Sequence, residues 1–148
     1  MTYYDFVKEY MNVDECKNNR KYSSAGHTFC WSKNNSTHAE GLYWFYEGDG
    51  FIIDVHDFYI REEVIRNSTY SMSDYVSIYS SYIVSANGEK FNPYQILTAN
   101  SLCTLDFDNI KDDFLFLLHE NCYYLAVSIG FKRELLDKHL SSINIDPE

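Results

Sequence analysis

The sequence predicts a mainly β domain, an antiparallel sandwich or barrel, with an α-helix at its end. Three observations support this fold class. Short segments that alternate apolar and polar residues follow one another between residues 38 and 107. Turn signals such as Gly48-Asp49-Gly50 and Asn87-Gly88 separate these segments. Aromatic residues, which strands favour, are abundant: 14 Tyr, 10 Phe and 2 Trp among 148 residues.

The strands are placed by these alternating runs and by the turns between them. The run from Gly41 to Ile60 predicts a hairpin, because the glycine turn in its middle supplies the positive-φ positions that tight turns need. Asn87-Gly88 predicts a second hairpin. Further strands are predicted at His27–Trp31, Asp74–Ser85, Ser101–Phe107 and Leu125–Phe131.

Helices are predicted at the two ends of the chain. Residues 3–12 form a possible short helix whose apolar side chains have helical spacing: Tyr3, Phe6, Val7 and Tyr10. Residues 132–143 form an amphipathic helix with Leu136, Leu140 and Ile143 on one face. This second helix either packs on its own domain or is offered to a partner subunit, so its three apolar residues are candidate dimer contacts.

The hairpin at 41–60 contains the candidate binding residues. Pairing it by its turn places Tyr46 opposite Phe51 and gives one wholly apolar face that includes Leu42, Trp44 and Ile53. The other face combines aromatic surface with an acid and an imidazole, and its members are candidates for an effector pocket: Tyr43, Phe45, Asp54, His56 and Phe58. Pockets are usually built in this way, mostly apolar with a few polar groups. A slip of one residue would exchange the two faces.

Charge and cysteine content narrow the classes of function. The chain has 12 basic and 22 acidic residues, a net charge of −10. Such a surface repels phosphate, which argues against direct binding of DNA or RNA. The four cysteines lack zinc spacing and are expected to be free thiols in a reducing cytoplasm. The first ten residues carry acids and tyrosines where a signal peptide has an apolar core, and no apolar run is long enough to span a membrane. We therefore expect a cytoplasmic protein.

Motifs for catalysis are missing from the sequence. It contains no GxSxG, no phosphate-binding loop and no dinucleotide fingerprint. One partial match concerns metal-binding β-barrels, which use a glycine, five residues, His-x-His, and a glutamate after three or four more residues. Gly50, His56 and Glu63 fit this spacing, but Phe58 replaces the second histidine. A site that loses an imidazole ligand loses much of its affinity, so we expect no metal or other cofactor and no enzyme activity.

The order of the segments resembles the N-terminal domain of AraC-family transcription regulators. The resemblance covers residues 38–143 and rests on GLYWFYEGDGFIIDVHDFYIREE, DYVSIYSSYIVSANGEKFNPYQILTAN and LAVSIGFKRELLDKHL. It implies that residues 1–148 form a single cupin-like sensor domain, an antiparallel jelly-roll barrel with a C-terminal helix. It also implies a helix-turn-helix DNA-binding domain after residue 148. No ligand residue can be carried over by motif.

Three functions follow as hypotheses from these observations. In the first, the barrel binds a small effector and controls a separate DNA-binding domain within a homodimer, with DNA contacted only through that second domain. A charged Asp54 would favour hydroxyl-rich or cationic effectors over anions. In the second, His56 and Glu63 remain from a divalent-metal site of a cupin enzyme. In the third, the domain binds no ligand and serves assembly.

Overall fold

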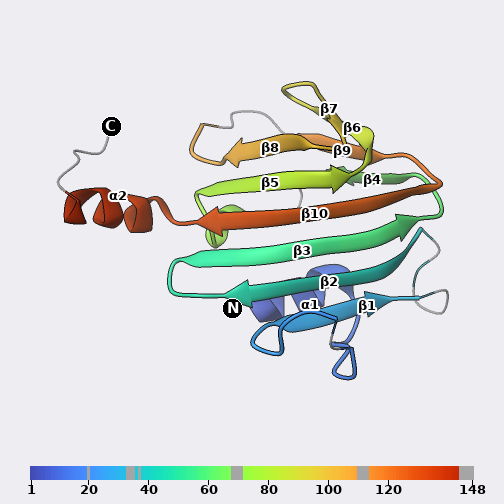
Figure 1. Ribbon diagram of the computed structural model, residues 1–148, viewed down its shortest axis with the longest axis horizontal. Coiled ribbons are helices and arrows are strands. Elements are labelled where there is room, and N and C mark those ends of the chain that lie inside the picture. The colour runs from blue at the N-terminus through green and yellow to red at the C-terminus, as the bar shows by residue number, and fades with distance from the viewer. Residues whose placement is uncertain (20, 33–35, 37, 68–71, 110–113, 144–148) are drawn as a thin grey trace.

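The computed structural model describes residues 1–19, 21–32, 36, 38–67, 72–109 and 114–143, and it shows a mainly β protein with one helix near each end (Figure 1). This confirms the predicted fold class. The helices are α1 (Tyr3–Met11), the 3-10 turn η1 (Met72–Asp74) and α2 (Arg133–Ser142). The strands are β1 (His27–Trp31), β2 (Ala39–Glu47), β3 (Phe51–Ile60), β4 (Val64–Asn67), β5 (Ile78–Ser85), β6 (Asn87–Phe91), β7 (Gln95–Thr98), β8 (Ser101–Asp106), β9 (Leu115–Leu118) and β10 (Cys122–Phe131).

The strands form two antiparallel sheets. The large sheet has the order β1-β2-β3-β10-β5-β8, and the small sheet has the order β4-β9-β6-β7. Each strand after β3 lies in the opposite sheet from the strand that precedes it, except β7, which forms a hairpin with β6 in the small sheet. Repeated crossing of this kind is typical of nested Greek keys. The closure of the two sheets into a jelly-roll barrel stays a prediction.

Helix α1 begins and ends at residues that satisfy its terminal backbone groups. The side chain of Thr2 accepts from the backbone of Asp5, and the Asp5 side chain accepts from the backbone of Thr2, which forms a capping box. Asn12 closes the other end in the left-handed conformation. The buried side chains Tyr3 and Val7 attach the helix to the inner face of the large sheet, where they share one core cluster with Phe29, Tyr43, Phe45, Ile52, Met72 and Val76.

A second, smaller core cluster lies farther along the same sheet. Ile83, Leu97, Cys103 and Ala126 are at most 5% exposed and come from β5, β7, β8 and β10. Leu97 belongs to the small sheet, so this cluster joins the two sheets. The burial of Cys103 agrees with its interpretation as an ordinary apolar core residue.

The hairpin of β2 and β3 differs from its prediction in register but not in faces. Tyr46 pairs with Ile53 rather than Phe51, so the pairing is shifted by two residues. Side chains in a strand alternate with a period of two, and a shift of two therefore leaves every residue on its predicted face. The turn is closed by a hydrogen bond of 2.9 Å from the Gly48 amide to the Phe51 carbonyl oxygen, and Gly50 has a φ of 82°.

Gly41 marks a close approach of two strands. It lies in β2 opposite Phe58 of β3 and has a φ of 139°, a conformation that side chains rarely adopt. A Cβ at this position would overlap with the backbone oxygen of Asp57. Only glycine fits this point of the sheet without a shift of the neighbouring strand.

Two expectations about the middle of the chain are wrong. Asn87-Gly88 does not turn a hairpin, because β5 belongs to the large sheet and β6 to the small one, and the chain crosses between the sheets at Ala86. The strand expected from Asp74 begins at Ile78, since Asp74 ends the 3-10 turn η1.

Helix α2 confirms the predicted amphipathic helix within one residue at each end. It extends beyond the end of β10, and none of its residues is buried (Figure 1). Neither this helix nor any other in the described part of the chain is long and apolar enough to cross a membrane.

Candidate ligand-binding cavity

A cavity of about 570 Å³ lies between the two sheets and α1. Its wall is formed by side chains of both sheets, of α1 and of η1, and most of that wall is aromatic or aliphatic. Aromatic rings from seven elements contribute: Tyr3, Trp31, Tyr43, Phe58, Tyr79, Phe116 and Tyr124. Members of both core clusters line the cavity, which therefore lies between the two clusters in the interior of the protein.

Three of the five predicted pocket residues line this cavity. Tyr43, His56 and Phe58 are part of its wall. Phe45 is fully buried and packs against the rings of Tyr3, Phe29 and Tyr43, so it belongs to the core. Asp54 is also fully buried, and it lies behind the wall rather than in it.

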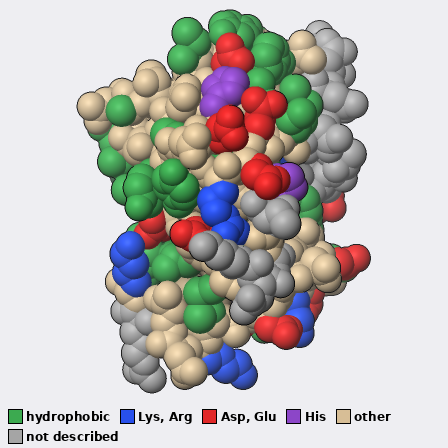
Figure 2. All heavy atoms as spheres, turned by 90° about the vertical axis from the view of Figure 1, so that its right-hand side faces the viewer, with side chains coloured by type: hydrophobic (Ala, Val, Ile, Leu, Met, Phe, Trp, Pro, Cys, Tyr) green, Lys and Arg blue, Asp and Glu red, His purple; other side chains and the backbone are tan. Residues whose placement is uncertain are grey.

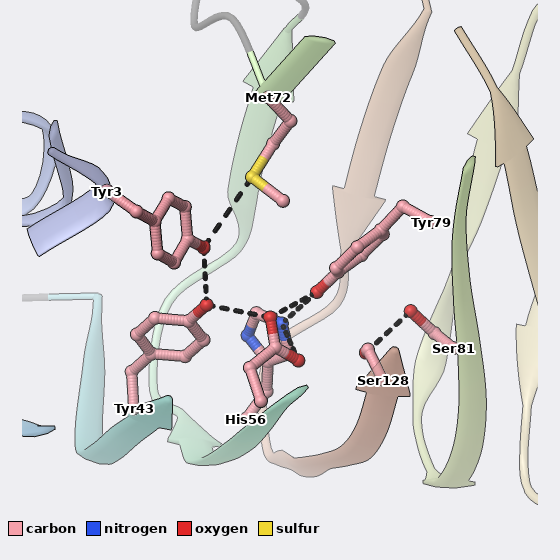
Figure 3. Close-up of polar contacts among 8 residues, drawn as sticks. Tyr3, Tyr43, His56, Met72, Tyr79, Ser81 and Ser128 are labelled. Atoms are coloured by element: carbon pink, nitrogen blue, oxygen red, sulfur yellow. Dashed lines mark hydrogen bonds and ion pairs between the residues drawn. The ribbon is translucent and has the colours of Figure 1, made fainter. Parts of the chain in front are cut away.

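Asp54 is the centre of a buried polar cluster, whose members Tyr3, Tyr43, His56 and Tyr79 are labelled in Figure 3. Its Oδ2 atom accepts hydrogen bonds from the hydroxyl of Tyr43 at 2.7 Å and from the hydroxyl of Tyr79 at 2.6 Å. The Tyr43 hydroxyl also lies 2.7 Å from that of Tyr3, and the Tyr79 hydroxyl lies 3.0 Å from Nε2 of His56. Four side chains from α1, β2, β3 and β5 are therefore connected through one carboxyl group.

The hydrogen count fixes the direction of these bonds. Tyr43 and Tyr79 each have one hydroxyl hydrogen, and both give it to Asp54. Tyr3 must then donate to the Tyr43 oxygen at 2.7 Å, and its longer contact of 3.6 Å with Sδ of Met72 shares the same hydrogen. His56 must donate from Nε2 to the Tyr79 oxygen. When the imidazole is neutral, its other nitrogen, Nδ1, carries the lone pair and can accept a hydrogen bond.

Burial sets the protonation of the cluster. It raises the pKa of Tyr43 and of Tyr79 well above the usual range, and the nearby Asp54 raises both further, so both phenols stay protonated. Loss of solvation lowers the pKa of His56 from 6.5, the Asp54 carboxylate opposes this shift, and the Arg66 guanidinium adds to it. The imidazole is therefore neutral at pH 7 and available as an acceptor at Nδ1.

The second oxygen of Asp54 is not satisfied. Oδ1 is buried and has no hydrogen-bond partner among the described residues, and it lies 3.6 Å from Nε2 of His56. An unpaired buried oxygen costs free energy unless a mobile group or a ligand compensates for it. The side chain of His56 is 23% exposed, so this histidine is the contact between the buried carboxyl group and the space of the cavity.

One edge of the cavity is charged. Arg66 and Glu63 belong to its wall, and the Arg66 guanidinium donates to the Tyr10 hydroxyl and lies over the Tyr10 ring at 5.2 Å. Glu63 pairs with His119 at 3.3 Å. Figure 2 faces the end of the sandwich where β3 ends and β10 begins, and it shows acidic side chains and histidines gathered there. Ion pairs between His38 and Glu62 and between Arg61 and Glu40 belong to the same region.

The partial metal motif does not assemble into a metal site. The described residues contain no group of three or more His, Cys, Asp or Glu that could hold an ion. His56 is bonded to Tyr79, Glu63 is bonded to His119, and Phe58 packs its ring against Trp31 and Tyr124. His56 and Glu63, the expected remnants of a metal site, thus have other partners.

Sequence reasoning missed two of the five residues of the polar cluster, Tyr3 and Tyr79. Tyr3 and Tyr79 belong to segments that were correctly predicted as a helix and a strand, yet no spacing in the sequence connects them to Asp54. The available signal was the alternation of β5, which places Tyr79, Ser81 and Ile83 on one face. The dimer-helix candidates Leu136 and Leu140 are half-buried, and Ile143 is 50% exposed.

No family model matches the chain, and a search of curated proteins finds no match.

Proposed function

We propose that this chain is the ligand-sensing and dimerisation domain of an AraC-type bacterial transcription regulator. In this proposal the cavity binds a small effector, and DNA is bound by a separate helix-turn-helix domain outside these 148 residues. The regulatory role rests on the order of the sequence segments. The binding role rests on one observation, the aromatic cavity of about 570 Å³ beside a buried Asp–Tyr–His cluster.

The size and lining of the cavity support a small-molecule ligand. Pockets for such ligands measure about 300–1,000 Å³ and combine an apolar lining with a few polar groups. This cavity lies within that range, and its polar groups are concentrated near His56 and at the charged edge. Stacking on Phe58 and Trp31 would hold a flat or apolar body.

The polar cluster favours a neutral ligand that donates a hydrogen bond. Asp54 cannot meet a ligand directly, because it is fully buried and both tyrosine hydroxyls that cover it are already donating. The acceptor that it leaves is Nδ1 of the neutral His56. The proposed effector is therefore an aromatic or aliphatic molecule with a hydroxyl group. The sequence also suggested a hydroxyl-bearing ligand, but there the bonding group was Asp54, whereas here it is Nδ1 of His56.

The effector can influence the regulator only through a conformation that it binds better than another. The cluster provides one connection, since Tyr43 and His56 line the cavity and the chain of bonds from Asp54 reaches Tyr3 in α1. A ligand that bonds to His56 would stabilise the arrangement in which α1 is attached to the large sheet.

Two measurements test the proposal. Native mass spectrometry of the purified chain would show a bound organic molecule if the cavity is filled during expression. The Trp44→Phe variant then leaves Trp31, a cavity residue, as the sole tryptophan, because Trp44 lies on the outer face with its indole nitrogen bonded to the Ser23 carbonyl oxygen. Its fluorescence is titrated with four probes of one body: para-butylphenol, butylbenzene, para-butylbenzoate and para-butylbenzylamine.

We expect para-butylphenol to bind most tightly, and the His56→Phe variant to lose that preference while butylbenzene still binds. The Trp31→Phe variant is the matched control, because its remaining Trp44 should not respond. If no organic mass is found and no probe changes the Trp31 signal, the binding role is wrong. If para-butylbenzylamine binds best, the ligand's ammonium group is attracted by Asp54, and the proposed preference for a neutral hydroxyl donor is wrong.

A further inference from the structure

The outer face of the large sheet exposes a group of large apolar side chains on three of its six strands, β10, β5 and β8. We call the following residues the outer patch: Tyr82, Val84, Leu102, Tyr123, Val127 and Ile129. Their exposed fractions run from 40% for Val84 to 64% for Leu102. Single exposed apolar residues are normal, but a contiguous patch indicates an interaction surface.

The strand register makes this patch contiguous. Val127 lies opposite Tyr82 on the neighbouring strand, and Tyr82 lies opposite Leu102 on the next. These three side chains form a row across three strands, with centres about 5 Å apart from strand to strand. In the neighbouring row, Ile129 lies opposite Ser80, whose hydroxyl is bonded to that of Thr104 at 2.9 Å. The middle of the face therefore contains no charged side chain.

Charge surrounds the outer patch without entering it. Asp57 on β3 is paired with Lys21 at 2.7 Å, and Asp106 at the end of β8 is paired with Arg133 at 3.2 Å. The whole chain nevertheless carries a net charge of −10. Two copies of such a chain repel one another over most of their surface, and this uncharged face is a place where they can meet without placing carboxylates together.

We propose that the outer patch is an interface between two copies of this chain. The faces of two antiparallel sheets pack at about 10 Å when apolar side chains interdigitate, and a two-fold axis would place each patch against itself. Three strands, β10, β5 and β8, cover about 14 Å by 27 Å, or about 400 Å² per copy. Two copies would bury about 800 Å², which is below the size of a standard interface and corresponds to a weak, reversible dimer.

This surface is distinct from the one that the sequence suggested. Helix α2 carries Leu136 and Leu140, but it lies beyond the end of β10 and its apolar side chains are fewer than those of the outer patch (Figure 1). The proposal does not depend on a ligand in the cavity, since the patch and the cavity lie on opposite faces of the same sheet.

Sedimentation velocity of the full 148-residue chain over a series of concentrations tests the proposal. We expect a reversible monomer–dimer equilibrium in the unaltered chain. The Val127→Asp variant should weaken it by at least about tenfold in dissociation constant, because each copy would bury a carboxylate in the contact. The double variant Val127→Thr with Leu102→Thr should weaken it too, and threonine keeps the β-branched shape that strands favour, so folding is preserved.

Two matched controls separate this surface from others. Ile96→Asp changes a side chain that is 59% exposed on the small sheet, and it should leave the equilibrium unchanged. Leu136→Asp with Leu140→Asp should leave it unchanged as well. The proposal is overturned if the unaltered chain is monomeric up to its solubility limit, or if the helix variants dissociate the dimer and the threonine variants do not.

Discussion

The two faces of the large sheet differ in a way that polarity alone would not predict. The inner face of the sheet buries Asp54, Ser81 and Ser128, each at most 7% exposed. The outer face exposes Val127 and Leu102, which are 46% and 64% exposed. The inner face, with its buried Asp54, is closed by α1 and the small sheet, whereas the outer face is open over β10, β5 and β8.

This difference shows that a face of the sheet is buried where another element packs on it and its polar groups have hydrogen-bond partners, whatever the hydropathy of its side chains. Buried polar groups on the inner face have nearby donors or acceptors, such as the pair of Ser81 and Ser128 hydroxyls at 2.8 Å, with Oδ1 of Asp54 as the exception among the described residues. On β2 and β3 the segment around Lys21, Tyr22 and Ser23 covers part of the outer face. Over β10, β5 and β8 the outer face has no covering element among the described residues, and the proposed second copy would supply one. The following four predictions test this contrast, from the largest expected effect to the smallest.

Neighbouring residues in β2 give the largest contrast. Phe45→Ala should lower the free energy of unfolding by about 4 kcal/mol, because it empties a fully buried site between α1 and the sheet. Tyr46→Ala, one residue farther on and 37% exposed on the outer face, should cost less than about 1 kcal/mol. Urea denaturation measures both. Equal losses would mean that the two faces are not inside and outside as described.

Removal of the buried carboxyl group comes next. Asp54→Ala should destabilise the fold by about 3 kcal/mol, because it leaves the Tyr43 and Tyr79 hydroxyls without an acceptor. Asp54→Asn keeps an oxygen acceptor and should lose less. Val127→Thr on the outer face is the control and should change stability by at most about 0.5 kcal/mol. An alanine variant as stable as the asparagine variant would contradict the central role of Asp54.

The link between α1 and the cluster predicts an intermediate effect. Tyr3→Phe removes only the hydroxyl that donates to Tyr43, so thermal unfolding should show a loss of about 1 kcal/mol. Tyr123→Phe makes the same change at a side chain that is 62% exposed on the outer face, where no measurable loss is expected. A loss that is the same in both variants would argue against a specific bond at Tyr3.

The smallest effect is a dependence of stability on pH. The pKa of His56 is 6.5 in the unfolded chain and lower in the folded protein, so the unfolded chain takes up a proton first as the pH falls. The unaltered chain should therefore lose stability relative to His56→Gln as the pH falls below 6.5. The difference becomes constant below the folded pKa. A difference of opposite sign would mean that Asp54 outweighs burial at this imidazole.

Local patterns predicted the elements well, because they depend on neighbours in the chain. The helical spacing of residues 3–12, the alternation at 101–107 and the amphipathic helix at 132–143 each depend on near neighbours, and each agrees with the structure within a few residues. The glycine turn gave the right hairpin and the right faces, although the register was shifted by two. The faces survived this error because of the two-residue period of a strand.

Long-range partners were not predictable from the same patterns. Asn87-Gly88 has the composition of a tight turn, yet the chain uses it to begin a strand in the other sheet. The Asp54 cluster needs Tyr3, which is 51 positions earlier in the numbering, and Tyr79, which is 25 positions away. Such contacts depend on the crossing of strands between sheets, and alternation within one strand contains no information about that crossing.

The close approach at Gly41 has a consequence for how this sequence can vary. Aromatic residues of the cavity wall can replace one another as ligands change, because each contributes surface rather than a fixed atom. Position 41 has no such freedom, since any side chain would collide with the backbone of Asp57. Among homologous chains, we therefore expect glycine at position 41 to be retained where the aromatic residues of the cavity wall vary. Gly41 and the turn at Gly50 should then identify this fold in a distant sequence better than the tyrosines do.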